Sequence, residues 1–213
     1  MQPAEVQAVL QALERAYPNA GPQLKFGNPF QLLVAAILSA QTTDKRVNKV
    51  TVGLFAKYPA PRDLARAAPE ELEEDIKSLG LFRSKSRNLV AAAGILVDRH
   101  GGEVPRSREE LMALPGVGRK VANVVLSQAF GQDVIAVDTH VFRVTNRIGL
   151  VRAGTPEEAE EQLTAILPPG TRGRAHHLFI FHGRYCCLAR SPRCGECPIS
   201  GYCRYCDRHH GKN

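Results

Sequence analysis

Lys120 is the residue whose position is least expected for its chemistry. It lies in the first turn of a predicted helix, directly after the stretch Leu114-Pro115-Gly116-Val117-Gly118-Arg119. A cation there faces the positive end of the helix dipole, and Arg119 adds a second positive charge. Both effects favour the neutral amine and predict a lowered pKa for Lys120. A neutral lysine amine can act as a nucleophile and form a Schiff base, whereas a lone lysine is most often a solvated surface residue.

The elements that must position Lys120 are two helices joined by a tight, glycine-rich turn. Ser107 and Glu110 have the spacing of a capping box at the start of the first helix, and Pro115-Gly116 ends it. The second helix opens at about Gly118, and its polar face is expected to carry Asn123 beside Lys120. The backbone N–H groups at its start, uncovered by side chains at the two glycines, predict a seat for a phosphate.

Asp138 is the second residue that could take part in chemistry. The apolar run 134–137 leads into a helix that begins at Asp138 or Thr139 and ends near Gly149. An aspartate at such a place is usually an N-cap. It can also assist proton transfer and stabilise a positive charge that develops nearby. The two roles are compatible.

All six cysteines lie in one short segment near the C-terminus. Four of them have the spacing C-x6-C-x2-C-x5-C, namely Cys187, Cys194, Cys197 and Cys203. Four thiolates this close together can hold a [4Fe–4S] cluster or a zinc ion. Zinc sites usually pair their cysteines as two C-x2-C units, and only one such pair is present, so the cluster is favoured. Cys186 and Cys206 are surplus to either site.

The charge of the chain is strongly positive and unevenly placed. The net charge is +7, and residues 171–213 hold eight Lys and Arg against Glu196 and Asp207. Such a basic region suits a polyanion, of which nucleic acid is the commonest, although the charge could simply keep the protein in solution. The N-terminus lacks the pattern of a signal peptide, and the longest apolar run, Leu32 to Leu38, is too short to span a bilayer. We therefore expect a cytoplasmic protein without a membrane segment.

Apolar periodicity predicts an all-α fold of about ten helices, with no convincing strand alternation. The segment from Phe30 to Ala40 is apolar on all sides and is expected to be a central buried helix. Ser84 is expected to cap a helix that reaches about His100, and the chain after Leu188 is expected to be a cysteine-bearing loop. A chain of 213 residues can form one large domain or two small ones.

Leu114 to Lys120 resembles the helix-hairpin-helix motif of the DNA glycosylase superfamily, and Val137-Asp138-Thr139-His140 resembles its downstream acid motif. With the cysteine spacing, the resemblance is to the bacterial endonuclease III family and extends from about Phe26 to Cys203. It implies a six-helix barrel domain of residues 22–132, and an iron–sulfur cluster domain formed by residues 1–21 with 133–213. The active site is then expected in the cleft between the domains, with Lys120 from one and Asp138 from the other.

The resemblance also implies an activity. Members of this family are bifunctional DNA glycosylases and AP lyases of base excision repair that remove oxidised pyrimidines. Lys120 matches their nucleophile, which attacks the sugar, displaces the base and forms a Schiff base before β-elimination of the 3′ phosphate. Asp138 matches its partner. The alternatives are a non-catalytic or weakly active DNA-binding paralogue, and a zinc-stapled adaptor.

Further residues are expected to contact DNA. Matching family positions imply Leu81 as a wedge and Gln41 as the residue that fills the gap left by the flipped base. The residues themselves indicate that Gly116 and Gly118 form the phosphate seat and that Arg190 and Arg193, on the loop between Cys187 and Cys194, hold phosphates. His140 either touches the flipped strand or is a packed or capping histidine. The backbone carbonyls of Met112, Leu114 and Val117 match positions that hold a monovalent cation, Na⁺ or K⁺. The expected partner is double-stranded DNA with damaged pyrimidines or abasic sites, bound by a monomer at the nucleoid. Thr42-Thr43 and Lys45-Arg46 depart from the family pattern near the presumed pocket, so base preference stays open.

Overall fold

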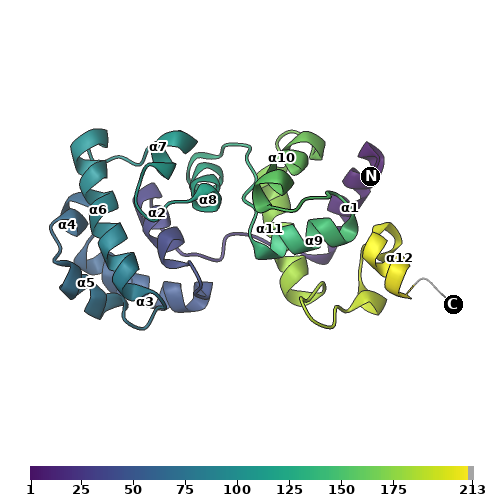
Figure 1. Ribbon diagram of the computed structural model, residues 1–213, viewed down its shortest axis with the longest axis horizontal. Coiled ribbons are helices and arrows are strands. Elements are labelled where there is room, and N and C mark those ends of the chain that lie inside the picture. The colour runs from purple at the N-terminus through teal and green to yellow at the C-terminus, as the bar shows by residue number, and fades with distance from the viewer. Residues whose placement is uncertain (211–213) are drawn as a thin grey trace. The chain divides into compact units, whose positions relative to one another are not determined.

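A computed structural model describes residues 1–210, and all of its regular structure within that range is helical (Figure 1). The all-α prediction is confirmed. The elements are α1 (Pro3–Ala16), α2 (Pro29–Leu38), α3 (Asp44–Lys57), α4 (Pro61–Ala65), α5 (Pro69–Ile76), α6 (Phe82–His100), α7 (Arg108–Met112), α8 (Arg119–Phe130), α9 (Thr139–Ile148), α10 (Pro156–Ile166), α11 (Arg172–Tyr185), the 3₁₀ helices η1 (Cys194–Glu196) and η2 (Ser200–Tyr202), and α12 (Arg204–His210).

The chain divides into two compact units. One is Pro22–Gly131, called here the hairpin unit because it contains α7 and α8. The other joins Met1–Gly21 to the chain from Gln132 onward and is called the cysteine unit. Independent folding of the two stays a prediction, because compactness alone does not make a domain that folds by itself.

The hairpin unit is built around α2. Asn28 caps this helix by accepting a hydrogen bond from the Gln31 N–H at 2.9 Å, and Pro29 supplies the first helical residue. All of its residues from Leu32 to Leu38 are buried, and it packs against α3, α6 and α8. A helix that is apolar on every side must be enclosed on every side, so the prediction of a central buried helix is confirmed.

The start of α6 differs from the expectation. The helix begins at Phe82, not at a Ser84 cap, and Ser84 lies in its first turn. The residue before it, Leu81, has a left-handed backbone with φ of 60°. This conformation reverses the chain in one residue and starts the helix earlier than a serine cap would, without a side-chain cap at all.

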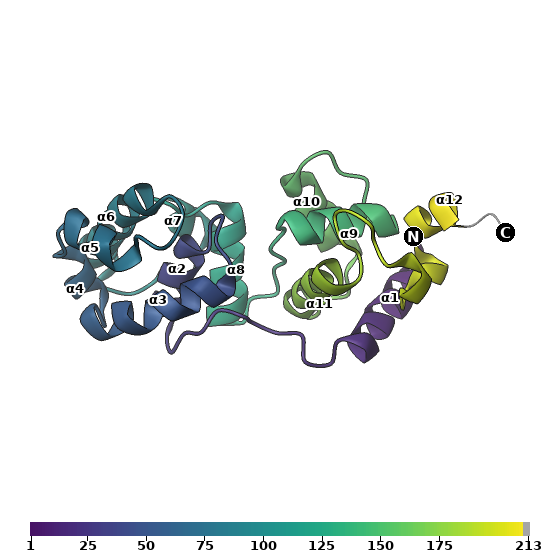
Figure 2. The same ribbon diagram turned by 90° about the horizontal axis from the view of Figure 1, so that it is seen from below.

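The cysteine unit brings the two ends of the chain together. α1, at the N-terminus, lies beside α11, and α11 packs against α9 (Figure 2). Arg174 of α11 stabilises this arrangement. Its guanidinium forms an ion pair with the Glu14 carboxylate of α1 at 2.5 Å and donates a hydrogen bond to the backbone carbonyl of Ala20. Cys187, Cys203 and Cys206 pack into the same core as the apolar side chains of these helices.

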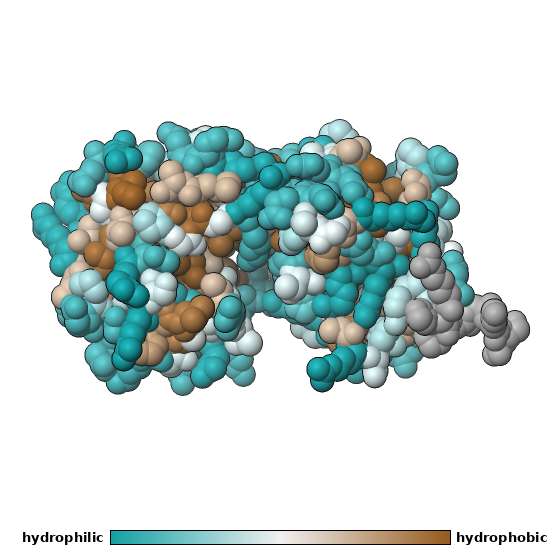
Figure 3. Space-filling model, in the orientation of Figure 1, coloured by the Kyte–Doolittle hydropathy of each residue, from teal (hydrophilic) through white to brown (hydrophobic). Residues whose placement is uncertain are grey.

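Few large hydrophobic side chains are exposed in the part of the chain that the structure describes. Figure 3 shows brown side chains at the surface of the hairpin unit, and the large exposed ones are Val52, Leu81 and Met112. Leu81 is 55% exposed, so it is not the small core contact that a leucine after a glycine usually makes. Across residues 1–210, no helix combines the length and the apolar character needed to cross a membrane.

Candidate active site and cysteine cluster

The hairpin that carries Lys120 forms as predicted. Ser107 Oγ accepts a hydrogen bond from the Glu110 N–H at 3.2 Å, so α7 is capped at the expected residue. The Glu110 carboxylate accepts from the Ser107 hydroxyl at 2.8 Å and completes the pair. Between α7 and α8, the Val117 N–H donates to the Leu114 carbonyl at 3.1 Å. A closed turn of this kind fixes where α8 begins.

The two glycines of the turn have different reasons to be there. Gly116 has φ of +81°, and a Cβ on it would lie 3.1 Å from the Asn88 side chain and 3.3 Å from Ile37. Gly118 is the extended N-cap of α8, and a Cβ on it would meet nothing within 4 Å. The fold therefore requires glycine at 116. At 118, the lack of a side chain instead keeps bulk away from the first turn of α8, and a helix N-terminus is a favourable place for an anion.

Lys120 is the second residue of α8 and is partly buried. The first turn of this helix contains Arg119 and Lys120 and no acidic residue. The local sequence thus places two cations at the positive end of the helix dipole, as expected. Asn123, expected on the polar face one turn later, is fully buried. Its amide is enclosed by the packing of α8 in the unit, which periodicity along the helix could not show.

Asp138 is the N-cap of α9. Its Oδ1 accepts from the His140 N–H at 2.9 Å and from the Val141 N–H at 2.8 Å. The capping interpretation is confirmed. Both bonds use the same oxygen, and Oδ2 makes no hydrogen bond within the described residues. A carboxylate held this way is oriented by one oxygen and keeps the other for chemistry.

His140 is packed against the interior of the cysteine unit. Its Nδ1 lies 3.1 Å from Arg143 Nη2, and a Cβ on Gly183 would approach its ring to 3.2 Å. Burial lowers the pKa of His140; the Asp138 charge opposes this shift and the Arg143 charge adds to it. A guanidinium can only donate, so Nδ1 accepts from Arg143 in the tautomer whose proton is on Nε2.

The four predicted ligand cysteines lie at the ends of short elements. Cys187 follows α11, Cys194 opens η1, Cys197 follows η1 and Cys203 follows η2. None of the six cysteines forms a disulfide. Burial raises the pKa of Cys197, and it raises that of Cys186 to about 12, so these sulfurs would be poor thiolates without a metal.

The surroundings of the ligand cysteines fit anionic, metal-bound sulfur. His182 Nε2 lies 3.7 Å from Cys197 Sγ, and Arg147 Nη1 lies 3.6 Å from Cys187 Sγ. N–H groups aimed at sulfur stabilise a thiolate ligand. The donor atoms of His182, Cys186 and Cys197 all lie within 4.8 Å of one another, so this close group contains one predicted ligand, Cys197, together with Cys186, which was not predicted to be one. The residues present are therefore compatible with a metal cluster.

Two arginines that the sequence reasoning missed hold the first part of the cysteine loop. Arg143 donates to the carbonyls of Gly183 and Cys187 at 2.9 and 3.1 Å, and Arg147 donates to those of Leu188 and Ala189 at 2.6 and 2.9 Å. They lie one turn apart on α9, the helix that Asp138 caps. Their spacing of four residues was the only available signal, because the carbonyls they meet lie some 40 residues later.

Arg190 and Arg193 are exposed on the same loop. Between them, Ser191 adopts a left-handed backbone with φ of 51°. The Arg193 N–H donates to the Cys186 carbonyl at 3.0 Å and closes the loop back on its origin. Arg190 and Arg193 are therefore exposed on a loop whose backbone is held by this hydrogen bond.

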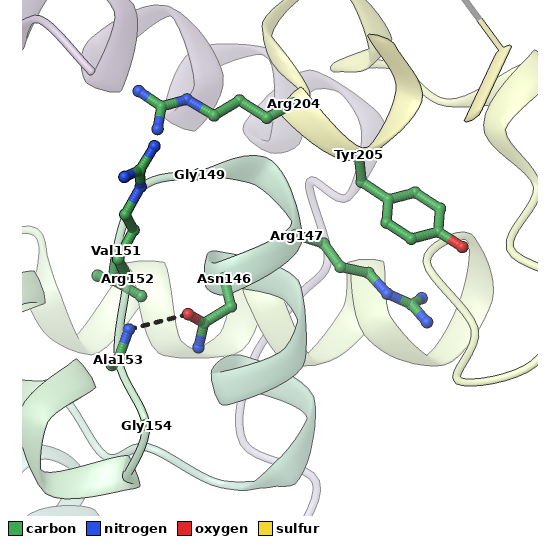
Figure 4. A pocket seen from close by; sticks show the side chains of 9 residues that line it. All are labelled: Asn146, Arg147, Gly149, Val151, Arg152, Ala153, Gly154, Arg204 and Tyr205. Atoms are coloured by element: carbon green, nitrogen blue, oxygen red, sulfur yellow. Dashed lines mark hydrogen bonds between the residues drawn. The ribbon is translucent and has the colours of Figure 1, made fainter. Parts of the chain in front are cut away.

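A basic hollow of about 540 Å³ lies at the C-terminal end of α9 (Figure 4). Arg147, Arg152 and Arg204 line it, and among the described residues no carboxylate does. Arg147 lies over the Tyr205 ring, 4.7 Å from its centroid, and the stem of Arg204 runs directly over Gly149. This hollow adds positive charge to the cysteine unit.

Gln41 and Leu81, the implied DNA probes, are both exposed residues of the hairpin unit. Each has a left-handed backbone, with φ of 54° and 60°. Lys85, which the sequence reasoning missed, is only 4% exposed, and burial lowers its pKa. Its position one turn after Leu81 gave no sign that its amine would be enclosed.

Two protein families match segments of this sequence. Residues 34–169 match the HhH-GPD superfamily of base excision DNA repair proteins, and residues 187–203 match the iron-sulfur binding domain of endonuclease III. The chain belongs to the endonuclease III family. The second match begins and ends at the first and fourth predicted ligand cysteines, so the cofactor of this endonuclease III family member is an iron–sulfur cluster.

Relatives matched over nearly their full length support the same family assignment. The chain is 48% identical to endonuclease III of Bacillus subtilis over 94% of its own length and 92% of the relative's. It is 45% identical to endonuclease III of Escherichia coli, with 92% and 93% covered. Among solved structures, a trapped endonuclease III–DNA covalent intermediate is 47% identical, with a TM-score of 0.93 and 98% of each chain covered. A non-covalent endonuclease III–DNA complex matches with a TM-score of 0.94 and full coverage of both chains.

Proposed function

We propose that this protein is a bifunctional DNA glycosylase and AP lyase of base excision repair that acts on oxidised pyrimidines in double-stranded DNA. The observation that carries the proposal is that the chain has both a lysine after a glycine hairpin and an N-cap aspartate, Asp138, whose Oδ2 makes no hydrogen bond within the described residues. Relatives supply the precedent, since one of them has been trapped as a covalent intermediate with DNA.

Lys120 is the nucleophile of the proposed reaction. The lone pair of its neutral Nζ forms a bond to C1′ of the damaged nucleotide, the C1′–N bond breaks, and the base leaves with that electron pair. Nζ then loses its proton, and the sugar opens to a Schiff base between C1′ and Nζ. Loss of a C2′ proton drives β-elimination, in which the 3′ phosphate leaves and the strand is cut.

Asp138 accepts a proton and stabilises the positive charge on the sugar and then on the iminium. Its Oδ1 is fixed by two backbone N–H groups, so Oδ2 needs no reorganisation when charge develops. Lys120 belongs to the hairpin unit and Asp138 to the cysteine unit. The proposed reaction therefore needs both units to act on one deoxyribose.

The DNA contacts are part of the same proposal. The N–H groups near Gly116 and Gly118 hold a phosphate, and the carbonyls of Met112, Leu114 and Val117 hold Na⁺ or K⁺ beside it. The Leu114 carbonyl has already accepted the Val117 N–H, which leaves it one lone pair for the cation. Leu81 enters the base stack as the wedge, and Gln41 fills the gap that the flipped base leaves.

The cysteine loop supplies further contacts. Arg190 and Arg193 bind DNA phosphates, and His140 contacts the flipped strand. Cys187, Cys194, Cys197 and Cys203 hold a [4Fe–4S] cluster, which crosslinks the loop when bound. We place the protein at the nucleoid in the cytoplasm as a monomer, since its substrate is chromosomal DNA.

Borohydride trapping tests the proposal. Wild-type protein incubated with a duplex that contains thymine glycol or an abasic site, then reduced, should form a covalent protein–DNA adduct. Lys120→Gln should form none and still bind the duplex, while Arg119→Gln, which removes the neighbouring cation, should still be trapped. DNA binding by the wild type without any adduct would instead support the non-catalytic paralogue.

A further inference from the structure

Two loops of the hairpin unit present the proposed DNA probes, and they lie side by side. Gln41 follows α2 and Leu81 precedes α6, and both are left-handed residues with a side chain. A Cβ on Gly80 would lie 4.0 Å from the Gln41 carbonyl, which shows how closely the loops approach. A left-handed backbone is unfavourable for such residues and persists only where the surroundings enforce it.

Lys85 contacts both loops. Its backbone N–H donates to the Leu81 carbonyl at 3.0 Å, and its side-chain Nζ donates to Thr42 Oγ1 at 3.0 Å. The Thr42 hydroxyl in turn donates to the Ala40 carbonyl at 3.3 Å. One residue is thus bonded to the Leu81 turn by its backbone and to the Gln41 turn by its side chain.

We propose that Lys85 is a positioning residue for nucleotide extrusion: through Thr42 it latches the Gln41 and Leu81 loops to one another, so that the two probes enter the DNA as one rigid pair. This inference rests on the proposed function, because it assigns Lys85 a part in a step that only a glycosylase needs.

The burial of Lys85 favours this role over plain packing. Its side chain is almost wholly enclosed, and within residues 1–210 no carboxylate lies within ion-pair distance of its amine. An enclosed cation without a counter-charge disfavours the folded state, and methionine would fill the same space without that cost. What methionine cannot do is donate to Thr42.

The test compares two substrates that differ only in pairing. One duplex carries an oxidised pyrimidine opposite its partner base, and the other carries the same lesion as a one-nucleotide bulge, which is already unpaired. Extrusion has to overcome base pairing only in the first. The variants are Thr42→Val, which removes the acceptor and keeps the shape, and Lys85→Met, which removes the amine. Thr43→Val is the matched control, because Thr43 is exposed and its side chain does not cap α3.

Single-turnover excision of the paired lesion should fall at least tenfold in Thr42→Val and Lys85→Met, and excision of the bulged lesion should change less than threefold. The control should match the wild type on both. Equal losses on the two substrates, or none on the paired one, would overturn the latch. If Lys85→Met does not fold, Thr42→Val decides alone.

Trapping on a preformed abasic site separates this inference from the proposed function. Wild type that forms no adduct there refutes the glycosylase–lyase assignment itself. Wild type that is trapped, together with a Thr42→Val variant that excises the paired lesion at the wild-type rate, refutes the latch alone.

Discussion

Gly116→Ala should destabilise the hairpin unit, and Gly118→Ala should not. At 116, alanine must adopt φ of +81°, which costs about 1–2 kcal/mol for a residue with a Cβ. The new methyl group would also press on Asn88 and Ile37 at 3.1 and 3.3 Å, and overpacking of this kind costs about 1–3 kcal/mol. The two effects together predict a loss of about 2–5 kcal/mol.

Gly118 provides the matched comparison. Its backbone is extended, and a Cβ there meets nothing within 4 Å. Alanine is a slightly poorer N-cap than glycine, but it also restricts the unfolded chain, so the net change should stay within about 0.5 kcal/mol. The added methyl group would, however, stand over the N–H groups proposed to hold a phosphate. Gly118→Ala should therefore fold normally and be trapped less efficiently on an abasic duplex.

The measurement is thermal and urea unfolding of the iron-loaded protein beside borohydride trapping at equal concentrations. Gly116→Ala should lower the melting temperature by on the order of 10 °C. A Gly116→Ala variant as stable as the wild type would refute the steric argument. A Gly118→Ala variant that is trapped as well as the wild type would refute the phosphate seat.

Three more predictions concern the cysteine unit. Asp138→Asn should keep its stability, because asparagine caps a helix as well as aspartate, and should lose at least about 100-fold in excision rate, whereas Asp138→Ala should also lose about 1 kcal/mol in urea unfolding. Gly149→Ala should cost at least about 1–2 kcal/mol, because its φ is +88° and the Arg204 stem occupies the space of the new methyl group; adding Arg204→Ala should recover only the steric part. Burial, with the charges of neighbouring His176 and Arg174, lowers the pKa of His177 to about 4, so the unfolded chain takes up this proton first, and stability should fall by up to about 3 kcal/mol as pH drops from 6.5 toward 4. His177→Gln should flatten that part of the stability curve.

Local signals predicted most helix starts and the hairpin correctly. Ser107 and Glu110 have the spacing of a capping box, and α7 begins directly after Ser107 as expected. A helix was expected to begin at Asp138 or Thr139, and Asp138 caps α9. The relevant interactions span only three or four residues, so the sequence contains both partners. The iron–sulfur loop was predictable for the same reason, since its ligands lie close together in the chain.

Features that depend on distant partners were missed. Lys85 is enclosed because Thr42, 43 residues earlier, meets its amine, and Arg143 is committed to carbonyls about 40 residues later. Periodicity cannot assign such partners. The helix α12 was expected to be loop because its sequence, rich in Arg and His, has no apolar stripe; it packs on α9 and η2 instead. The roles of individual DNA contacts stay predictions.

The split composition of the cysteine unit has a consequence for biosynthesis. Met1–Gly21 is translated before the hairpin unit, and its partners in the cysteine unit, α11 and the cysteine loop, are translated after it. At about 5–20 residues per second, the first helix waits roughly 10–40 s for them, while the hairpin unit in between can already condense. An iron–sulfur cluster can be held only after Cys203, the last of its four proposed ligands, has been translated. Cofactor loading therefore requires the segment 187–203, and a product truncated before Cys187 would retain the hairpin with Lys120, the proposed nucleophile, but would lack the cysteines that hold the cluster.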